Sequence, residues 1–153
     1  MRALEFLERP NLIAKQITSA LRKVDLYRSM TQRITCSLEG EVVSRTRDVT
    51  SNETAIIKLM EAEEVLTKLR SEYAAVVEEV TTVVETLADE FAVSILIQRY
   101  IENKPVSEIS KMLNLSRTRV YVHLDTGISE LDKLLEKSGR NGTQRDTTGR
   151  NGT

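Results

Sequence analysis

Two arginines, Arg117 and Arg119, closely follow a serine and lie among side chains that are able to contact nucleic acid. A guanidinium group can donate two parallel hydrogen bonds to guanine O6 and N7, or it can bind a phosphate. Thr118 and Val122 carry methyl groups that can pack on a thymine methyl, and Tyr121 can donate to a phosphate or lie across a sugar. We therefore predict a surface that binds double-stranded DNA, made by Ser116, Arg117, Thr118, Arg119, Tyr121, Val122 and His123.

A helix over residues 116–125 would present most of these side chains on one face. A helix turns by about 100° per residue. With Val120 as the buried centre, the side chains that point outward are Thr118, Tyr121, Val122 and Asp125. Asp125 limits the footprint, because phosphates repel a carboxylate unless it accepts from a cytosine amine. His123 is expected to flank this surface or to contact a phosphate. For either arginine alone, a solvated surface charge is the alternative interpretation.

The segment that would position this helix is 106–124, VSEISKMLNLSRTRVYVHL, which has the spacing of two helices joined by a tight turn. Small Ser110 allows the two helices to cross closely. Asn114 stands where the turn needs a left-handed residue, a conformation that Asn adopts more readily than most side chains. Ser116 is predicted to be the N-cap of the second helix. An ordinary helical hairpin is the alternative. The apolar residues that would pack the helices together are Ile109, Leu113, Leu115, Val120 and Leu124.

The run from Leu87 to Leu135 resembles region 4 of sigma-70 factors. It contains a leading helix, the link RYIENKP at 99–105, the pattern ISKML at 109–113 and SRTRV at 116–120. From about Leu12 to Leu135 the chain is also similar to small phage and prophage proteins of low-GC Gram-positive bacteria, related to the ArpU and RinA late transcription regulators. The resemblance implies an all-α protein in which a helical N-terminal half precedes a sigma region 4-like helix-turn-helix.

Three positions depart from the sigma pattern. Asn114 stands where that pattern usually has Gly, His123 stands where many members carry an apolar or basic residue, and Gly127 falls early in the last helix. No part of the chain resembles sigma region 2, so the resemblance does not imply promoter melting.

The composition argues against an enzyme, a metalloprotein and a membrane protein. Among 153 residues there is one cysteine and one histidine, which excludes an internal disulfide and argues against a zinc site. The chain has no Gly-rich phosphate loop and no HExxH motif, so we predict no catalysis and no cofactor. The longest apolar run, FAVSILI at 91–97, is too short to span a bilayer, and residues 1–10 do not resemble a signal peptide. We expect a cytoplasmic protein of a bacterial host cell, with no membrane partner.

The net charge of −1 hides a strong asymmetry along the chain. Residues 1–50 carry nine Lys or Arg and six Asp or Glu, residues 51–90 carry three and ten, and residues 91–153 carry ten and seven. The acidic middle is therefore excluded as a DNA-binding surface. The modest positive charge of the last third predicts weak non-specific affinity for DNA, which favours binding by more than one copy or with a partner.

Two apolar stripes predict a long, coiled-coil-like helical hairpin in the N-terminal half. The hairpin would pack its stripes against each other or against a second chain, as a homodimer. The longer stripe should stay partly open over 76–87, where either a second chain or Phe91, Ile95 and Leu96 of the same chain would cover it. The shorter stripe, which opens after Pro10, is Ile13, Ile17, Ala20, Val24, Tyr27, Thr31, Ile34 and Leu38, and the longer is Ala55, Leu59, Ala62, Leu66, Leu69, Tyr73, Val76, Val80, Val83 and Leu87.

These patterns divide the chain into three predicted parts. Residues 1–86 form the helical hairpin, with a polar loop at 39–53 and with Ser51 or Asn52 as the cap of the long helix. Residues 87–137 form the helix-turn-helix domain. Residues 138–153 contain GRNGT twice and no large apolar side chain, so we predict a disordered tail.

Three functions of different classes fit this organisation. The first is a sequence-specific DNA-binding transcription regulator of phage type, which reads a promoter or operator with helix 116–125. The second is a DNA-packaging recognition subunit, of the kind found in small terminases, which normally forms a ring. The third is a protein-only adaptor that docks on RNA polymerase. Native mass would separate the first two, and a salt-dependent gel shift would separate both from the third.

Overall fold

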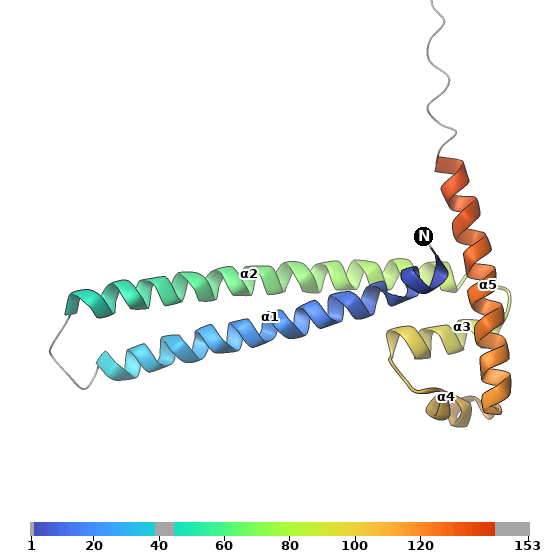
Figure 1. Cartoon of the computed structure of the whole chain (residues 1–153), viewed down its shortest axis with the longest axis horizontal. Helices are drawn as coiled ribbons and strands as arrows, with labels where there is room; N and C mark the ends of the chain where they lie inside the picture. The colour runs from blue at the N-terminus through green and yellow to red at the C-terminus, as the bar shows by residue number, and fades with distance from the viewer. Residues whose placement is uncertain (1, 39–44, 143–153) are drawn as a thin grey trace, which may run out of the picture. The chain divides into compact units, whose positions relative to one another are not determined.

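The computed structural model describes residues 2–38 and 45–142, and every regular element in these ranges is helical. The predicted all-α class is therefore confirmed for the described residues. Figure 1 shows the order of the elements along the chain. They are α1 (Ala3–Leu38), α2 (Arg45–Val84), α3 (Glu90–Leu96), the π-helical turn η1 (Ile97–Ile101), α4 (Val106–Leu113) and α5 (Arg117–Gly142). In the described ranges, no helix combines the length and apolar character that crossing a bilayer requires.

α1 begins at Ala3, so the helix extends seven residues before Pro10, after which the predicted stripe opens. The Ala3 N–H donates to Asp132 Oδ1 at 2.6 Å. This contact satisfies a free donor at the helix start and places negative charge at the positive end of the helix dipole. Ala3, Phe6, Leu7 and Pro10 are buried at helical spacing. Their burial offsets the backbone hydrogen bond that a proline inside a helix cannot make.

α2 begins at Arg45, so the predicted loop at 39–53 is wrong for residues 45–53, and residues 39–44 lie outside the described residues. Ser51 and Asn52 are inside the helix and are not its caps. The polar residues at 45–53 cost only about 0.3–0.7 kcal/mol each relative to Ala in a helix, and none is Gly or Pro. Because extending a helix costs much less than starting one, α2 continues through them.

The contacts divide the chain into two compact units. One is Leu12–Ala75, which we call the two-helix unit, and the other combines Met1–Asn11 with Val76–Thr153, which we call the terminal unit. This division differs from the predicted boundary between 86 and 87. Val76, Val80 and Val84 are buried on the last turns of α2, and they belong to the terminal unit.

The two-helix unit packs the two predicted stripes against each other. Ala20, Val24 and Leu66 are its buried cluster, and the half-buried Ile17, Leu59, Ala62 and Leu69 pack around them. Every described member of the stripes within this unit is buried or half-buried, as predicted, and the side chain of Leu38 lies outside the described residues.

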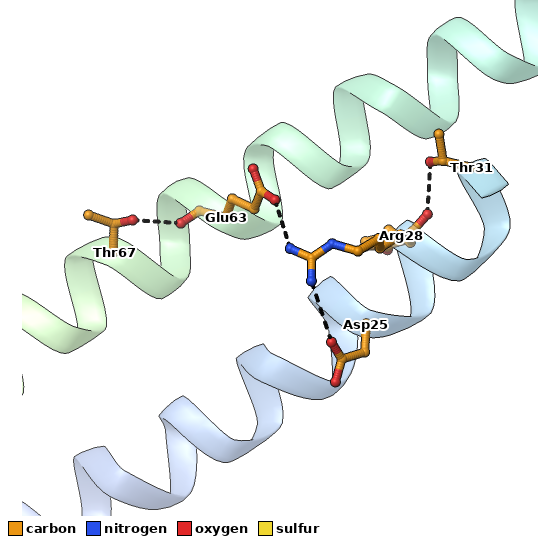
Figure 2. A network of polar contacts seen from close by, with 6 residues as sticks. Asp25, Arg28, Thr31, Glu63 and Thr67 are labelled. Carbon is orange, nitrogen blue, oxygen red and sulfur yellow. Dashed lines mark hydrogen bonds and ion pairs between the residues drawn. The ribbon is translucent and has the colours of Figure 1, made fainter.

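Polar contacts also join the two helices of this unit. Figure 2 shows Arg28 of α1 reaching Glu63 of α2, with 3.2 Å between Nη2 and Oε1, while its Nη1 lies 4.0 Å from Asp25. These side chains are about half exposed, so the pair contributes at most about 1 kcal/mol. The apolar stripe, rather than this ion pair, holds the helices together.

The terminal unit has a core of its own. The end of the α2 stripe is buried within it, so the expected opening at 76–87 is closed inside the same chain. Ile95 and Leu96 are buried as expected, but Phe91 is 46% exposed, so its predicted packing is wrong. The buried apolar side chains of this core include Val76, Val80, Val84, Leu87, Ala92, Ile95, Leu96, Ile109, Val120, Leu124 and Leu131.

α5 is longer than the predicted helix over 116–125 and continues to Gly142. The predicted disordered tail is therefore wrong for residues 138–142, and residues 143–153 lie outside the described residues. Adding residues to an existing helix fixes one residue for each new hydrogen bond. A long helix packed along much of its length can therefore carry a few polar residues at its end.

Candidate nucleic-acid interface

The turn between α4 and α5 is held by the backbone conformation of Asn114 and by hydrogen bonds of Ser110. Asn114 has φ 52° and ψ 39°, the predicted left-handed conformation, and its N–H donates to the Ser110 carbonyl. The Leu115 N–H donates to the same carbonyl at 3.1 Å, and the Ser110 hydroxyl donates to the Leu115 carbonyl at 2.6 Å. Ser110 thus closes the turn by hydrogen bonding, a role beyond the close helix crossing that its small size predicted.

Ser116 begins the second helix as predicted. The Arg119 N–H donates to Ser116 Oγ at 3.2 Å, and the Val120 N–H donates to the Ser116 carbonyl at 3.0 Å. An N-cap serine is worth about 1 kcal/mol and fixes the residue at which a helix starts. The turn and the cap together set the direction in which the first turns of α5 leave the protein surface.

One face of α5 is buried against α3 and α4. Ile109 of α4 and Val120 of α5 are fully buried, Leu124 is nearly so, and Leu113 and Leu115 are half-buried. Three of the five apolar residues predicted to pack here are thus buried, and Leu113 and Leu115 are partly so. Gly127 lies where α5 meets α3, since a Cβ there would stand 3.0 Å from Ala92 Cβ and 3.1 Å from Leu96 Cδ1. The absence of a side chain at Gly127 thus permits the close approach of α3.

The opposite face of α5 exposes six of the seven predicted DNA-contacting residues. Tyr121 is 51% exposed and Val122 is 58% exposed. Within the described ranges, neither Arg117 nor Arg119 has a hydrogen bond or ion pair to its guanidinium, so both remain able to donate to a ligand. The exposed residues on this face are Ser116, Arg117, Thr118, Arg119, Tyr121 and Val122, with Asp125 one turn further on.

His123 lies elsewhere, between the exposed face and the core. A 2.6 Å hydrogen bond joins its Nδ1 to Asp89 Oδ2, and its ring centroid is 5.2 Å from that of Phe91. Its side chain is only 23% exposed. Because the ring is held against the start of α3, we leave His123 out of the proposed interface.

Asp89 joins two elements of the terminal unit. Its Oδ1 accepts from the Phe91 N–H at 3.0 Å and caps α3, while Oδ2 bonds to His123 of α5. The hydrogen bond to His123 is the largest effect that lowers the pKa of the Asp89 carboxyl below its ordinary value of 3.8, with smaller contributions from backbone N–H groups. Asp89 was not predicted as the cap of α3, although Asp followed by Glu before an apolar run is a recognisable helix start.

The basic residues of the link before α4 have partners inside the link. The ammonium group of Lys104 lies 2.6 Å from Glu102 Oε2, and Arg99 Nη1 donates to the Lys104 carbonyl at 3.4 Å. Lys111, in the last turn of α4, is exposed. On the exposed first turns of α5 the positive charge comes from Arg117 and Arg119, and the neighbouring helix carries the exposed Lys111.

No protein-family model, curated protein or solved structure matches this chain. Among the described residues, no three His, Cys, Asp or Glu side chains come together in a way that could hold a metal ion.

Proposed function

We propose that this protein is a sequence-specific DNA-binding transcription regulator with a sigma region 4-like helix-turn-helix, in which the first turns of α5 enter the major groove. The observation that carries this proposal is the exposed row on α5. Two unpaired guanidinium groups flank Thr118 and Val122 there, on a helix whose start is fixed by a left-handed turn and a serine cap. Such a row supplies donors for guanine and methyl groups for thymine on the first turns of one helix.

The packing behind α5 supports this use of its exposed face. Ile109 and Val120 are fully buried, and Gly127 lets α3 approach closely on the same buried face. A helix that reads bases needs such support, because a small displacement of its side chains weakens paired hydrogen bonds to a base edge. In this proposal Lys111 contacts the phosphate backbone, and the last turns of α5 lie outside the groove.

The test selects bound sites from a random DNA library and then measures affinity for the selected site by fluorescence anisotropy. Arg117→Ala and Arg119→Ala should each cost roughly 1–3 kcal/mol of specific binding and relax the preference at one base position. The matched control is Arg140→Ala, which removes an exposed arginine from the far end of the same helix. It should leave the sequence preference unchanged.

Other results would change the assignment in distinct ways. Equal weakening on all sequences would reassign the arginines to phosphate contacts. A folded protein that binds no DNA would point to the protein-only adaptor. Specific binding that neither arginine variant alters would overturn the assignment of α5 as the reading helix.

A further inference from the structure

A second stripe runs along each helix of the two-helix unit, beside the stripe that is buried. Its residues recur at the same alternating spacing of four and three, so each second stripe stays on one side of its helix. On α1 it is Leu12, Gln16, Ser19, Lys23, Leu26 and Met30, and on α2 it is Thr54, Lys58, Glu61, Val65, Lys68 and Glu72.

The two second stripes lie on the same side of the helix pair. A shallow groove is lined by Lys23 from α1 and by Lys58, Glu61 and Val65 from α2. A second groove further along is lined by Gln16 and Ser19 with Lys23 and Val65. The two grooves share Ala20, Lys23 and Val65 in their linings, so residues of both stripes border the same side of the helix pair. We call this side of the unit the groove face.

The groove face exposes apolar side chains that a two-helix unit cannot cover by itself. Leu12, Leu26, Met30 and Val65 are each between 42% and 57% exposed. On the other side of the pair, Arg28 and Glu63 already bridge the two helices. The groove face thus combines exposed apolar surface with charged residues that have room to meet a partner.

Two antiparallel copies of the α2 stripe would place opposite charges next to each other. Around Val65 the order is Lys58, Glu61, Val65, Lys68 and Glu72. When a second copy of α2 runs in the opposite direction with Val65 at the centre, Lys58 faces the partner's Glu72. In the same alignment Val65 faces the partner's Val65, and Glu61 lies within one residue along the helix of the position facing the partner's Lys68. No like charges face each other, and charges in such flanking positions set partner choice and orientation between helices.

We propose that the groove face is a self-association surface, on which a second copy of this chain docks with its α2 antiparallel to the first and with the two-fold axis beside Val65. The balance of two lysines and two glutamates on the α2 stripe gives it no net charge, which argues against a nucleic acid as the occupant. Docking would bury Leu12, Leu26, Met30 and Val65 and would turn each helix pair into half of a four-helix arrangement. The proposal does not depend on DNA binding.

Charge exchange between two variants tests this alignment. Lys58→Glu with Lys68→Glu makes the stripe acidic throughout, and Glu61→Lys with Glu72→Lys makes it basic throughout. Sedimentation of the full chain at micromolar concentration should give a dimer for the unchanged protein. Each variant alone should raise the dimer dissociation constant by roughly tenfold or more, because like charges then face each other. An equimolar mixture of the two variants should restore the dimer.

A cross-link provides a second measurement that does not rely on the charges. In a Cys36→Ser background, Val65→Cys should form a disulfide between two chains on oxidation, because the symmetry axis brings this position next to its own copy. The matched control is Met60→Cys, whose position on the same helix is 64% exposed but lies away from the groove face. It should remain a free thiol.

The proposal fails if the unchanged protein is a monomer, if both charge variants remain dimers, or if the mixture does not recover the dimer. Equal cross-linking at positions 60 and 65 would also overturn it. Circular dichroism of each charge variant establishes that the helices are intact, and the recovery in the mixture shows independently that both variants are folded.

Discussion

The two compact units exclude water from their apolar residues to different degrees. In the terminal unit Val80, Ile95, Ile109, Val120 and Leu131 are completely buried. In the two-helix unit the most deeply buried side chain is Val24, which keeps 3% of its surface exposed. Two helices can cover one stripe of each other and no more, whereas the terminal unit surrounds its core with elements from several directions.

This difference separates two tasks within one chain. The terminal unit buries one face of α5 against α3 and α4 and leaves the other face exposed, so it suits a function that needs a fixed helix on its surface. The two-helix unit leaves one long side uncovered, so it suits association with another surface of similar character. The following predictions test how far this contrast holds.

The largest effect is expected from shortening a leucine in each core. Leu131→Ala leaves a cavity in a fully buried site and should lower the free energy of unfolding by about 4 kcal/mol. Leu66→Ala removes the same atoms from a site with half-buried neighbours, so the loss should be nearer about 2–3 kcal/mol. Urea unfolding at one protein concentration, followed by circular dichroism, measures both. Equal losses would remove the contrast between the two units.

A smaller effect should come from adding one methyl group to α5. Gly127→Ala would place a Cβ at 3.0 Å from Ala92 Cβ, and such overpacking costs about 1–3 kcal/mol. Gly139→Ala is the matched control on the same helix. A Cβ there meets nothing within 4 Å, so it should stabilise the helix by up to about 1 kcal/mol. Opposite signs of the change in melting temperature are expected. Because Gly127→Ala gains the same helix propensity, a neutral variant would mean that moving α3 away from α5 costs only about 1 kcal/mol.

The smallest effect concerns pH and the contact between Asp89 and His123. The hydrogen bond to His123 lowers the pKa of the Asp89 carboxyl in the folded protein. The stabilisation that this hydrogen bond gives the folded protein is therefore present at pH values above 3.8, the ordinary pKa of the carboxyl. It is lost as the pH falls through the lowered pKa of the folded state. Asp89→Asn keeps a helix cap but removes the charge. The difference in melting temperature between the two proteins should be largest above pH 4 and shrink in stronger acid. A difference in melting temperature that stays the same at every pH would mean that the charge of Asp89 does not contribute to stability.

Local chemistry explains what could be predicted from the sequence. The turn and the helix cap are formed by Asn114, Ser116 and the apolar residues around them, which lie within a few positions of each other. The end of α4, the turn and the start of α5 can therefore be predicted from local sequence. The stripes on α1 and α2 were predictable for the same reason, because helical spacing alone decides which side of each helix is apolar.

Contacts between distant residues explain what was missed. The Ala3 N–H meets Asp132, 129 positions away, and Asp89 meets His123, 34 positions away. Neither pair can be recognised without knowing how the elements pack. The start of α2 was misplaced for a different reason. The polar residues at 45–53 lack helical periodicity and predict a loop, but a growing helix overrides such weak local preferences.

The contact between Ala3 and Asp132 also affects the order in which the two units can fold during synthesis. During synthesis the first residues of α1 emerge from the ribosome long before Asp132 exists, and their partner arrives only when α5 has been made. The two-helix unit needs only residues 12–75, so it has all its parts early. The terminal unit, although it contains Met1–Asn11, is completed after the two-helix unit.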